Sequence, residues 1–131
     1  MLRADDARRA LDTGVDGLIV SNHGGRQVDG SIAALDALIT VRTVTNPAVP
    51  VLLDGGVRRG SDVIKAIALG ANAVLVGRPY IYGLAVGGRT GVHEVLSNLL
   101  AETDSVLALS GHSRLDEIDC DTLAGQGCPR P

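Results

Sequence analysis

The residues best suited to chemistry lie in one short polar segment that follows an apolar run. In order, the segment contains Ser21, Asn22, His23, Gly24, Gly25, Arg26 and Gln27. An imidazole can accept a proton, and a guanidinium three residues later can hold a carboxylate through paired hydrogen bonds. The two glycines between them allow a tight turn and a close approach of the backbone to a ligand. This spacing indicates an active-site loop.

The position of this segment strengthens that interpretation. The preceding run, residues 17–20, is apolar and is typical of a buried parallel strand. In alternating α/β proteins, ligands bind at the carboxyl ends of the strands. A lone histidine is often only a structural residue, but the strand end, the flanking glycines and Arg26 favour a catalytic role for His23.

Two further loops have the composition of a phosphate site. The first contains Asp54, Gly55, Gly56, Val57, Arg58, Arg59, Gly60 and Ser61, and the second contains Gly77, Arg78 and Pro79. Free backbone N–H groups, the positive end of a following helix and an arginine together favour a phosphate dianion. In the alternative interpretation the glycines only form turns and the arginines are only solvated. Two such loops after adjacent strands favour the phosphate site.

Three side chains near these loops have open roles. Asp54 is either a buried structural carboxylate or an acceptor for the hydroxyls of a cofactor, and a catalytic role fits it less well. Tyr80 and Tyr82 are expected to pack a short helix rather than to contact substrate.

The chain alternates helices and strands. We expect helices over residues 5–13, 31–44, 62–69, 79–86 and 92–109, and strands over residues 15–20, 49–53 and 73–76. Ser31 and Ser61 are the expected N-caps of the second and third helices. The expected apolar face of the second helix consists of Ile32, Leu35, Leu38 and Ile39. The last ten residues are expected to have no fixed structure.

An internal repeat supports this layout. Residues 6–21 align without gaps on residues 62–77, an offset of 56 that corresponds to two helix–strand units. Alternating units predict a parallel sheet, and polar glycine-rich loops at all three strand ends favour a barrel over a doubly wound sheet. Three strands cannot close the eight-stranded barrel, which needs roughly 250 residues. The sequence therefore predicts an α/β fold, the C-terminal three βα units of a partial (β/α)8 TIM barrel over residues 1–123, with a flexible tail at residues 124–131.

Composition narrows the class of protein. The formal net charge of -3 provides no basic stripe for nucleic acid, and no apolar run is long enough to span a bilayer. The N-terminus lacks the apolar region of a signal peptide, so a cytoplasmic location is expected. Cys120 and Cys128 match no common zinc spacing, so no metal site is expected, and reduced thiols are favoured over a disulfide.

These motifs resemble the FMN-dependent 2-hydroxy acid oxidases and dehydrogenases, which include glycolate oxidase, lactate oxidase, lactate 2-monooxygenase and mandelate dehydrogenase. The resemblance covers residues 2–123. The His-Gly-Gly-Arg loop is the specific part of it, because other phosphate-binding barrels share the glycine-arginine loops.

The resemblance implies a cofactor, FMN, and a role for each matching residue. His23 would be the base and Arg26 the clamp for the substrate carboxylate, and Ser21 would touch the flavin. The FMN ribityl chain and phosphate would be held by Asp54, Gly55, Gly56, Val57, Arg58, Gly77 and Arg78. The implied reaction oxidises a small 2-hydroxy acid to the 2-oxo acid, and the full-length form would be a homo-oligomer.

The sequence departs from the family by lacking the front half of the barrel. In the family that half contributes a lysine beside the flavin and an aspartate that orients the histidine. Two other readings therefore stay open. The chain is either a catalytically incomplete fragment that at most binds FMN phosphate, or a different phosphate-binding barrel enzyme. The substrate side chain and the electron acceptor are not specified.

Overall fold

The computed structural model describes residues 1–123, which form three strands and four α-helices with three short 3-10 turns. The strands are β1 (Leu18–Ser21), β2 (Val51–Asp54) and β3 (Ala73–Leu75), and the α-helices are α1 (Ala4–Asp12), α2 (Ala34–Arg42), α3 (Gly60–Ala68) and α4 (Arg78–Leu109). The 3-10 turns span His23–Gly25, Leu115–Glu117 and Cys120–Thr122. The expected flexible tail at residues 124–131 lies outside the described residues.

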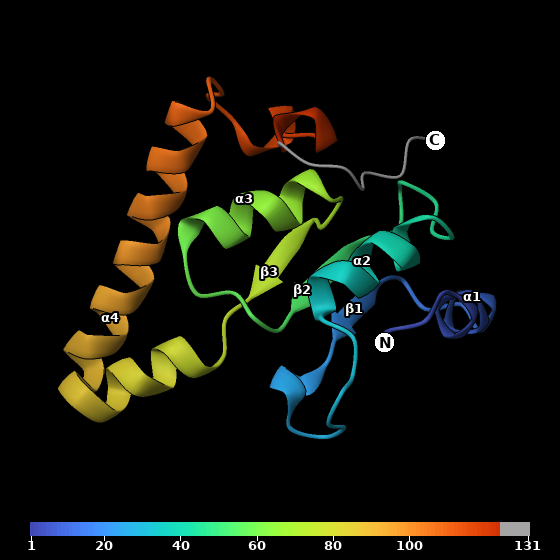
Figure 1. The fold of residues 1–131 in the computed structure, drawn as a ribbon, viewed down its shortest axis with the longest axis horizontal. Helices are drawn as coiled ribbons and strands as arrows, with labels where there is room; N and C mark the ends of the chain where they lie inside the picture. The colour runs from blue at the N-terminus through green and yellow to red at the C-terminus, as the bar shows by residue number, and fades with distance from the viewer. Residues whose placement is uncertain (124–131) are drawn as a thin grey trace.

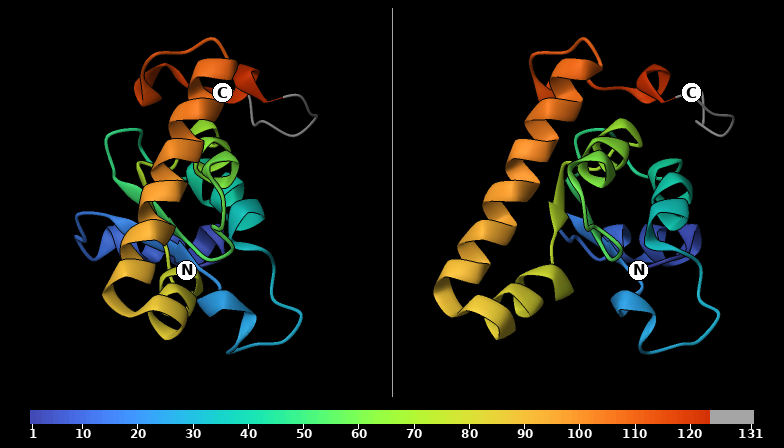
Figure 2. Two further views of the ribbon diagram at one scale, coloured as in Figure 1. Left: turned by 90° about the vertical axis from the view of Figure 1, so that its left-hand side faces the viewer. Right: turned by 60° about the vertical axis from the view of Figure 1, so that its left-hand side comes forward.

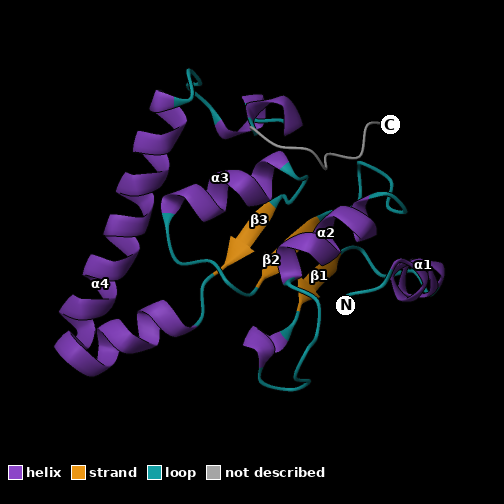
Figure 3. Ribbon diagram, in the orientation of Figure 1, coloured by secondary structure: helices purple, strands orange, loops and turns teal. Residues whose placement is uncertain are grey.

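The strands form one parallel sheet in the order β1-β2-β3 (Figure 3). In this register Ser21 lies opposite Asp54, and Asp54 lies opposite Leu75. The three strands therefore end at the same edge of the sheet, where the polar loops begin (Figure 1). The predicted α/β architecture with three parallel βα units is confirmed.

The core lies between the sheet and the helices that cover one of its faces. Alternate strand residues point into it, and Leu18, Val20, Val51 and Leu53 are at most 5% exposed. Side chains of α2 and α3 complete this core. On the other face, Ile19 of β1 is 49% exposed, and Leu52 beside it is only half-buried. One face of the sheet is therefore packed and the other is open.

The repeat found in the sequence is also present in the structure. Helix α3 begins and ends 56 residues after α1, and β3 overlaps the span that the same offset gives β1. Gly14 and Gly70 end the two helices with φ of +87° and +97°, a backbone conformation that glycine adopts without the strain of a side chain. These two units, α1–β1 and α3–β3, therefore turn from helix to strand in the same way.

Two expected helix starts are wrong. Helix α2 begins at Ala34, and Ser31 lies three residues before it in a turn to Val28. Helix α3 begins at Gly60, so Ser61 lies inside it, and the carboxylate of Asp62 accepts hydrogen bonds from the backbone N–H groups of Arg58 and Arg59 at 3.0 Å. An acidic side chain in the first turn meets the positive end of the helix and replaces the serine cap.

The buried face of α2 is also different from the expected one. Its buried residues are Ala34, Ala37, Leu38 and Val41, whereas Ile32 precedes the helix and is 45% exposed. The buried residues keep helical spacing, but the small alanines allow the helix to lie close to the sheet. Of the expected face, Leu38 lies in the core and Leu35 is partly buried against it.

The expected pair of C-terminal helices is found as two parts of α4. Gly87 and Gly88 depart from helical geometry and separate a short first part from a long second part that packs beside α3 (Figure 2). The two parts approach through glycine, because a Cβ on Gly91 would stand 2.0 Å from the carbonyl oxygen of Gly83.

At the amino ends of the strands, Arg42 joins several loops. Its guanidinium donates to the carbonyl oxygens of Gly70 at 2.6 Å and Val49 at 3.0 Å, and to Oδ1 of Asn72 at 2.8 Å. Partial burial lowers the pKa of the Arg42 guanidinium below its ordinary value. The fixed fork of donors suits this role, and it lies at the end of the sheet away from the polar loops.

Two expectations concern the rest of the chain. Cys120 takes part in a disulfide, so the expectation of a reduced thiol at that position is wrong. Cys128 lies outside the described residues. Within residues 1–123 no helix has the length and apolarity that a membrane span requires.

Candidate functional site

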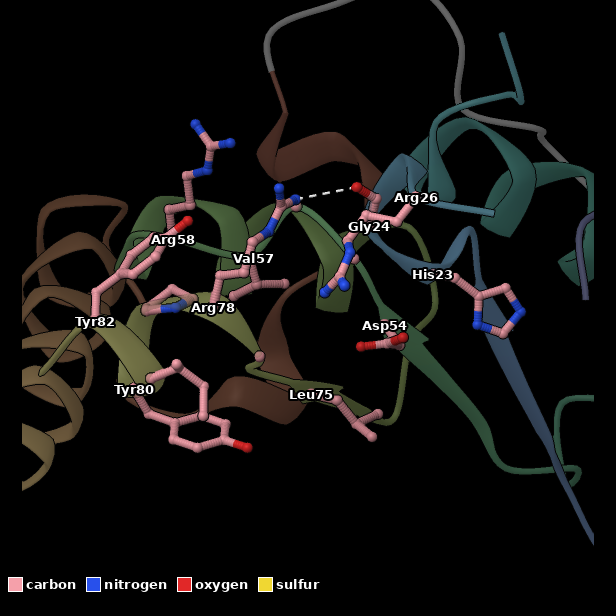
Figure 4. A pocket seen from close by; sticks show the side chains of 15 residues that line it. His23, Gly24, Arg26, Asp54, Val57, Arg58, Leu75, Arg78, Tyr80 and Tyr82 are labelled. Carbon is pink, nitrogen blue, oxygen red and sulfur yellow. Dashed lines mark hydrogen bonds between the residues drawn. The ribbon is translucent and has the colours of Figure 1, made fainter. Parts of the chain in front are cut away.

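The loops after the three strands meet around one open cleft of about 750 Å³ (Figure 4). Nine residues predicted for the site from the sequence line it: His23, Arg26, Asp54, Gly55, Gly56, Val57, Arg58, Gly77 and Arg78. These residues come from three segments that are far apart in the sequence. The parallel sheet brings the segments together, because the carboxyl ends of its strands share one edge.

The His23 loop has an unusual backbone. Among the described residues, His23 is the one non-glycine residue with a positive φ, +55°, and Gly24 and Gly25 follow with +68° and +72°. For a residue with a Cβ this conformation costs roughly 1–2 kcal/mol. Three left-handed residues in a row turn the chain sharply after β1 and bring His23 and Arg26, both exposed, to the cleft.

Side chains hold this turn in place. Asn22 Oδ1 accepts from the N–H of Gly24 at 3.0 Å, and Ser21 Oγ accepts from the N–H of His23 at 3.0 Å. Ser21 Oγ also donates to Asp54 Oδ2 at 2.5 Å, across the register pair of β1 and β2. Ser21 is 8% exposed and is not among the residues that line the cleft.

The glycine loops offer open space where a phosphate would need it. Gly56 has a φ of +83°, and a Cβ built on Gly56 or on Gly77 would meet no atom within 4 Å. Both residues line the cleft, and Gly77 directly precedes the first turn of α4. A phosphate can therefore approach the backbone at both loops and at the positive end of α4.

The charge in the cleft is opposite to that of the whole chain. Arg26, Arg58 and Arg78 line it together with a single carboxylate, Asp54, although the formal net charge of the protein is -3. The ion pairs among residues 1–123 are Arg8 with Asp5 and Arg114 with Asp116, so none of the three cleft arginines is paired with a carboxylate there. Unpaired guanidinium groups around an open space favour an anionic ligand.

The start of α3 offers fewer free backbone N–H groups for a phosphate than the sequence suggested. Three backbone donors at or just before this helix end are already used, because Gly60 N–H donates to Glu102 Oε2 at 3.0 Å and Asp62 accepts from the N–H groups of Arg58 and Arg59. Fewer backbone donors are therefore free at this helix end than the sequence suggested, and phosphate binding there stays a prediction. The loop before it and the start of α4 remain available.

The structure adds residues that sequence reasoning missed. Tyr80 and Tyr82 line the cleft on the side opposite His23 and are 38% and 62% exposed, so they do not only pack a helix (Figure 4). Arg78 Nη2 donates to the carbonyl oxygen of Gly24 at 3.2 Å, which joins the third loop to the His23 loop. The position of the tyrosines just after Gly77-Arg78-Pro79 was the available signal.

Comparison with known proteins agrees with this geometry. A family model described as FMN-dependent dehydrogenase matches residues 1–125. An L-lactate oxidase from Nostoc sp. is 54% identical over 94% of this chain and 34% of its own length. The peroxisomal (S)-2-hydroxyacid oxidase GLO3 of Arabidopsis thaliana is 55% identical over 90% of this chain and 32% of its own.

Solved structures give the same result. An active mutant of (S)-mandelate dehydrogenase in its oxidised form superposes with a TM-score of 0.90 at 48% identity, over 96% of this chain and 35% of that one. Mandelate oxidase with benzoyl-formic acid superposes with a TM-score of 0.86 at 44% identity, over 90% of this chain and 35% of that one. The chain thus spans about a third of the length of the relatives it matches.

Proposed function

The chain belongs to the FMN-dependent dehydrogenase family, and from that premise we propose that it forms the phosphate-binding and proton-accepting part of a 2-hydroxy acid oxidoreductase. The substrate would be a small acid resembling lactate or glycolate, and the product the 2-oxo acid. The observation that carries the proposal is the meeting of three loops at one cleft, with His23 and Arg26 at one side and two glycine-arginine loops beside them.

Each residue has a proposed task that follows from its chemistry. Arg26 holds the substrate carboxylate through paired hydrogen bonds, and this places the α-hydroxyl and α-carbon near His23. His23 accepts a proton as the substrate loses two electrons. FMN, when bound, supplies the two-electron acceptor.

The residues present fit the phosphate end of FMN. The open backbone at Gly56 and Gly77 and the unpaired guanidinium groups of Arg58 and Arg78 suit a dianion. Asp54 suits the ribityl hydroxyls, because a half-buried carboxylate accepts hydrogen bonds. Val57, whose side chain is 4% exposed, would contribute through its backbone. A flavin contact for Ser21 remains a prediction.

The test is the visible spectrum of the purified chain after incubation with FMN and desalting, followed by anaerobic addition of L-lactate. We expect the protein to retain the yellow colour of FMN, because the residues proposed to bind the phosphate all belong to this chain. Bleaching on addition of the acid supports the oxidoreductase. A colourless protein contradicts the proposed phosphate site.

A second candidate is a catalytically incomplete fragment that only binds FMN phosphate. Residues 1–123 contain three strands where the barrel has eight, and one sheet face is open at Ile19. Colour that is retained but does not bleach with a series of 2-hydroxy acids favours this candidate.

Two further proposals concern the oligomeric state and the cellular location of the full-length form. We propose a homo-oligomer, which sedimentation of the full-length form tests. A cytoplasmic location also stays a proposal, because one relative is named peroxisomal and one solved structure is titled a monotopic membrane protein. Fractionation of cells that express the full-length form tests it.

A further inference from the structure

We propose that Ser21 and Asp54 are positioning residues that fix the backbone of His23 at the edge of the cleft. The catalytic meaning of this inference rests on the proposed function, whereas the geometry of the two side chains does not. The resemblance to known enzymes suggested a flavin contact for Ser21. That contact stays a prediction, and the structure points to a further role through the histidine.

The register of the sheet creates the first contact. Ser21 and Asp54 are opposite each other in β1 and β2, and Ser21 Oγ donates to Asp54 Oδ2 at 2.5 Å. An ionised carboxylate only accepts hydrogen bonds, so it fixes the direction of the hydroxyl proton. With Ser21 8% exposed, little water competes for this bond.

The second contact uses the other side of the same oxygen. Because the hydroxyl proton points to Asp54, the lone pairs of Ser21 Oγ are free to accept, and the N–H of His23 donates to them at 3.0 Å. A hydroxyl polarised by a carboxylate is the stronger acceptor. The charge of Asp54 thereby strengthens a bond to the backbone of His23.

His23 needs such a restraint more than its neighbours do. Its φ of +55° is costly for a residue with a Cβ, whereas Gly24 and Gly25 adopt similar angles freely. Without the bond from Ser21, the backbone of His23 can relax toward a negative φ, and its imidazole then leaves the cleft.

The contact between Ser21 and Asp54 also links His23 to the cleft where a ligand would bind. Asp54 lines the cleft, and within residues 1–123 its other oxygen, Oδ1, has no hydrogen-bond partner (Figure 4). A ligand hydroxyl that donates to Oδ1 would therefore hold Asp54 in the position that restrains His23.

Amide hydrogen exchange by NMR tests the restraint in the 131-residue chain without cofactor. In Ser21→Ala we expect the His23 amide to exchange about tenfold faster or more, as for the loss of one hydrogen bond. The Gly24 amide is the internal control, because it donates to Asn22 Oδ1. Ser21→Thr keeps the hydroxyl and should restore the wild-type rate at His23. Asp54→Ala, which removes only the partner of the hydroxyl, should give an intermediate rate.

A second readout concerns the flavin. With FMN bound, Ser21→Ala should slow reduction by the 2-hydroxy acid at least tenfold while the Kd for FMN stays within threefold. An unchanged exchange rate at His23, or an equal rise at Gly24 and at Val51 in β2, overturns the proposal. A loss of FMN affinity larger than the loss of reduction rate also overturns it, in favour of a flavin contact. If FMN bound to the wild-type protein is not reduced by the 2-hydroxy acid, the proposed function fails. The amide exchange rates still decide the role of Ser21.

Discussion

His23 and Arg26 lie on one loop, yet they depend on different supports. His23 is held through its backbone by Ser21, and no residue in the described part of the chain hydrogen-bonds its imidazole. Arg26 is exposed and free of ion pairs within residues 1–123, so its guanidinium is available to a ligand. At the scale of single residues, the backbone of His23 is held by a hydrogen bond, whereas the side chains of His23 and Arg26 are open to a ligand.

Arg26→Lys should weaken binding of 2-oxo and 2-hydroxy acids by about tenfold to a hundredfold, because lysine cannot form paired hydrogen bonds with a carboxylate. Spectral titration of the FMN-loaded protein with the acid measures the Kd. Arg89→Lys, at an exposed position outside the cleft, is the matched control. Equal affinity in Arg26→Lys and wild type would contradict a carboxylate clamp.

Gly55→Ala should destabilise the fold by about 2–3 kcal/mol. Gly55 has a φ of +118°, and an added Cβ would stand 2.6 Å from Asn22 Oδ1, which the Gly24 N–H already uses. Gly25→Ala is the control, because a Cβ there meets no atom within 4 Å and costs only about 1 kcal/mol of backbone strain. Urea denaturation of both variants gives the difference. Equal losses would show that Asn22 does not constrain Gly55.

At the scale of elements, contacts between loops and helices connect the parts of the site. The loop after β3 reaches the loop after β1 through Arg78 and Gly24, passing over the end of β2. The backbones of α3 and α4 approach closely at Gly60, whose N–H donates to Glu102. The cofactor loops and the His23 loop are therefore parts of one connected structure.

Arg78→Gln and Arg58→Gln remove the same charge from the same cleft, and each should weaken FMN binding about tenfold or more. Only Arg78→Gln should also shift the NMR amide signal of Gly25, because the carbonyl oxygen that Arg78 binds belongs to the Gly24–Gly25 peptide group. A similar shift in Arg58→Gln would argue against a direct link from Arg78 to this loop.

Gly60→Ala should destabilise the chain by about 1–3 kcal/mol, through overpacking between α3 and α4. An added Cβ would stand 2.2 Å from the backbone nitrogen of Thr103. Gly87→Ala is the control, since its φ of -134° is ordinary and a Cβ there meets nothing within 4 Å. Thermal unfolding measures both variants. If Gly60→Ala unfolds at the same temperature as wild type, α4 can move away from α3 without a loss of stability, and the prediction is contradicted.

At the scale of the whole molecule, the sheet has two open edges and one uncovered face. In the described part of the chain β1 and β3 each have one neighbouring strand, and Ile19 on the uncovered face is 49% exposed. Edge strands with unpaired backbone groups and an apolar face favour association.

The chain alone should therefore self-associate as its concentration rises, and Ile19→Lys should reduce that association. Leu109→Lys, which also replaces an exposed apolar residue but lies at the end of α4, should leave it unchanged. Sedimentation velocity over a range of concentrations measures the effect. A chain that stays monomeric at high concentration would contradict this prediction.

The sequence by itself determined the order of the elements and the composition of the site. Apolar runs, glycine helix ends and a 56-residue repeat are local signals, and a parallel sheet necessarily places the three strand ends at one edge. Nine of the ten predicted site residues line the cleft for this reason. Ser21 is the exception, because its side chain lies beneath the loop, bonded to Asp54.

Only the tertiary structure decided which groups those residues touch. Glu102 occupies a donor at the start of α3 from 42 residues away, and Arg78 reaches Gly24 from 54 residues away. The buried face of α2 was likewise set by its fit against the sheet rather than by its own hydrophobic pattern. Helix caps, packing faces and loop contacts depend on partners distant in the chain, and a local sequence pattern has no information about where those partners will lie.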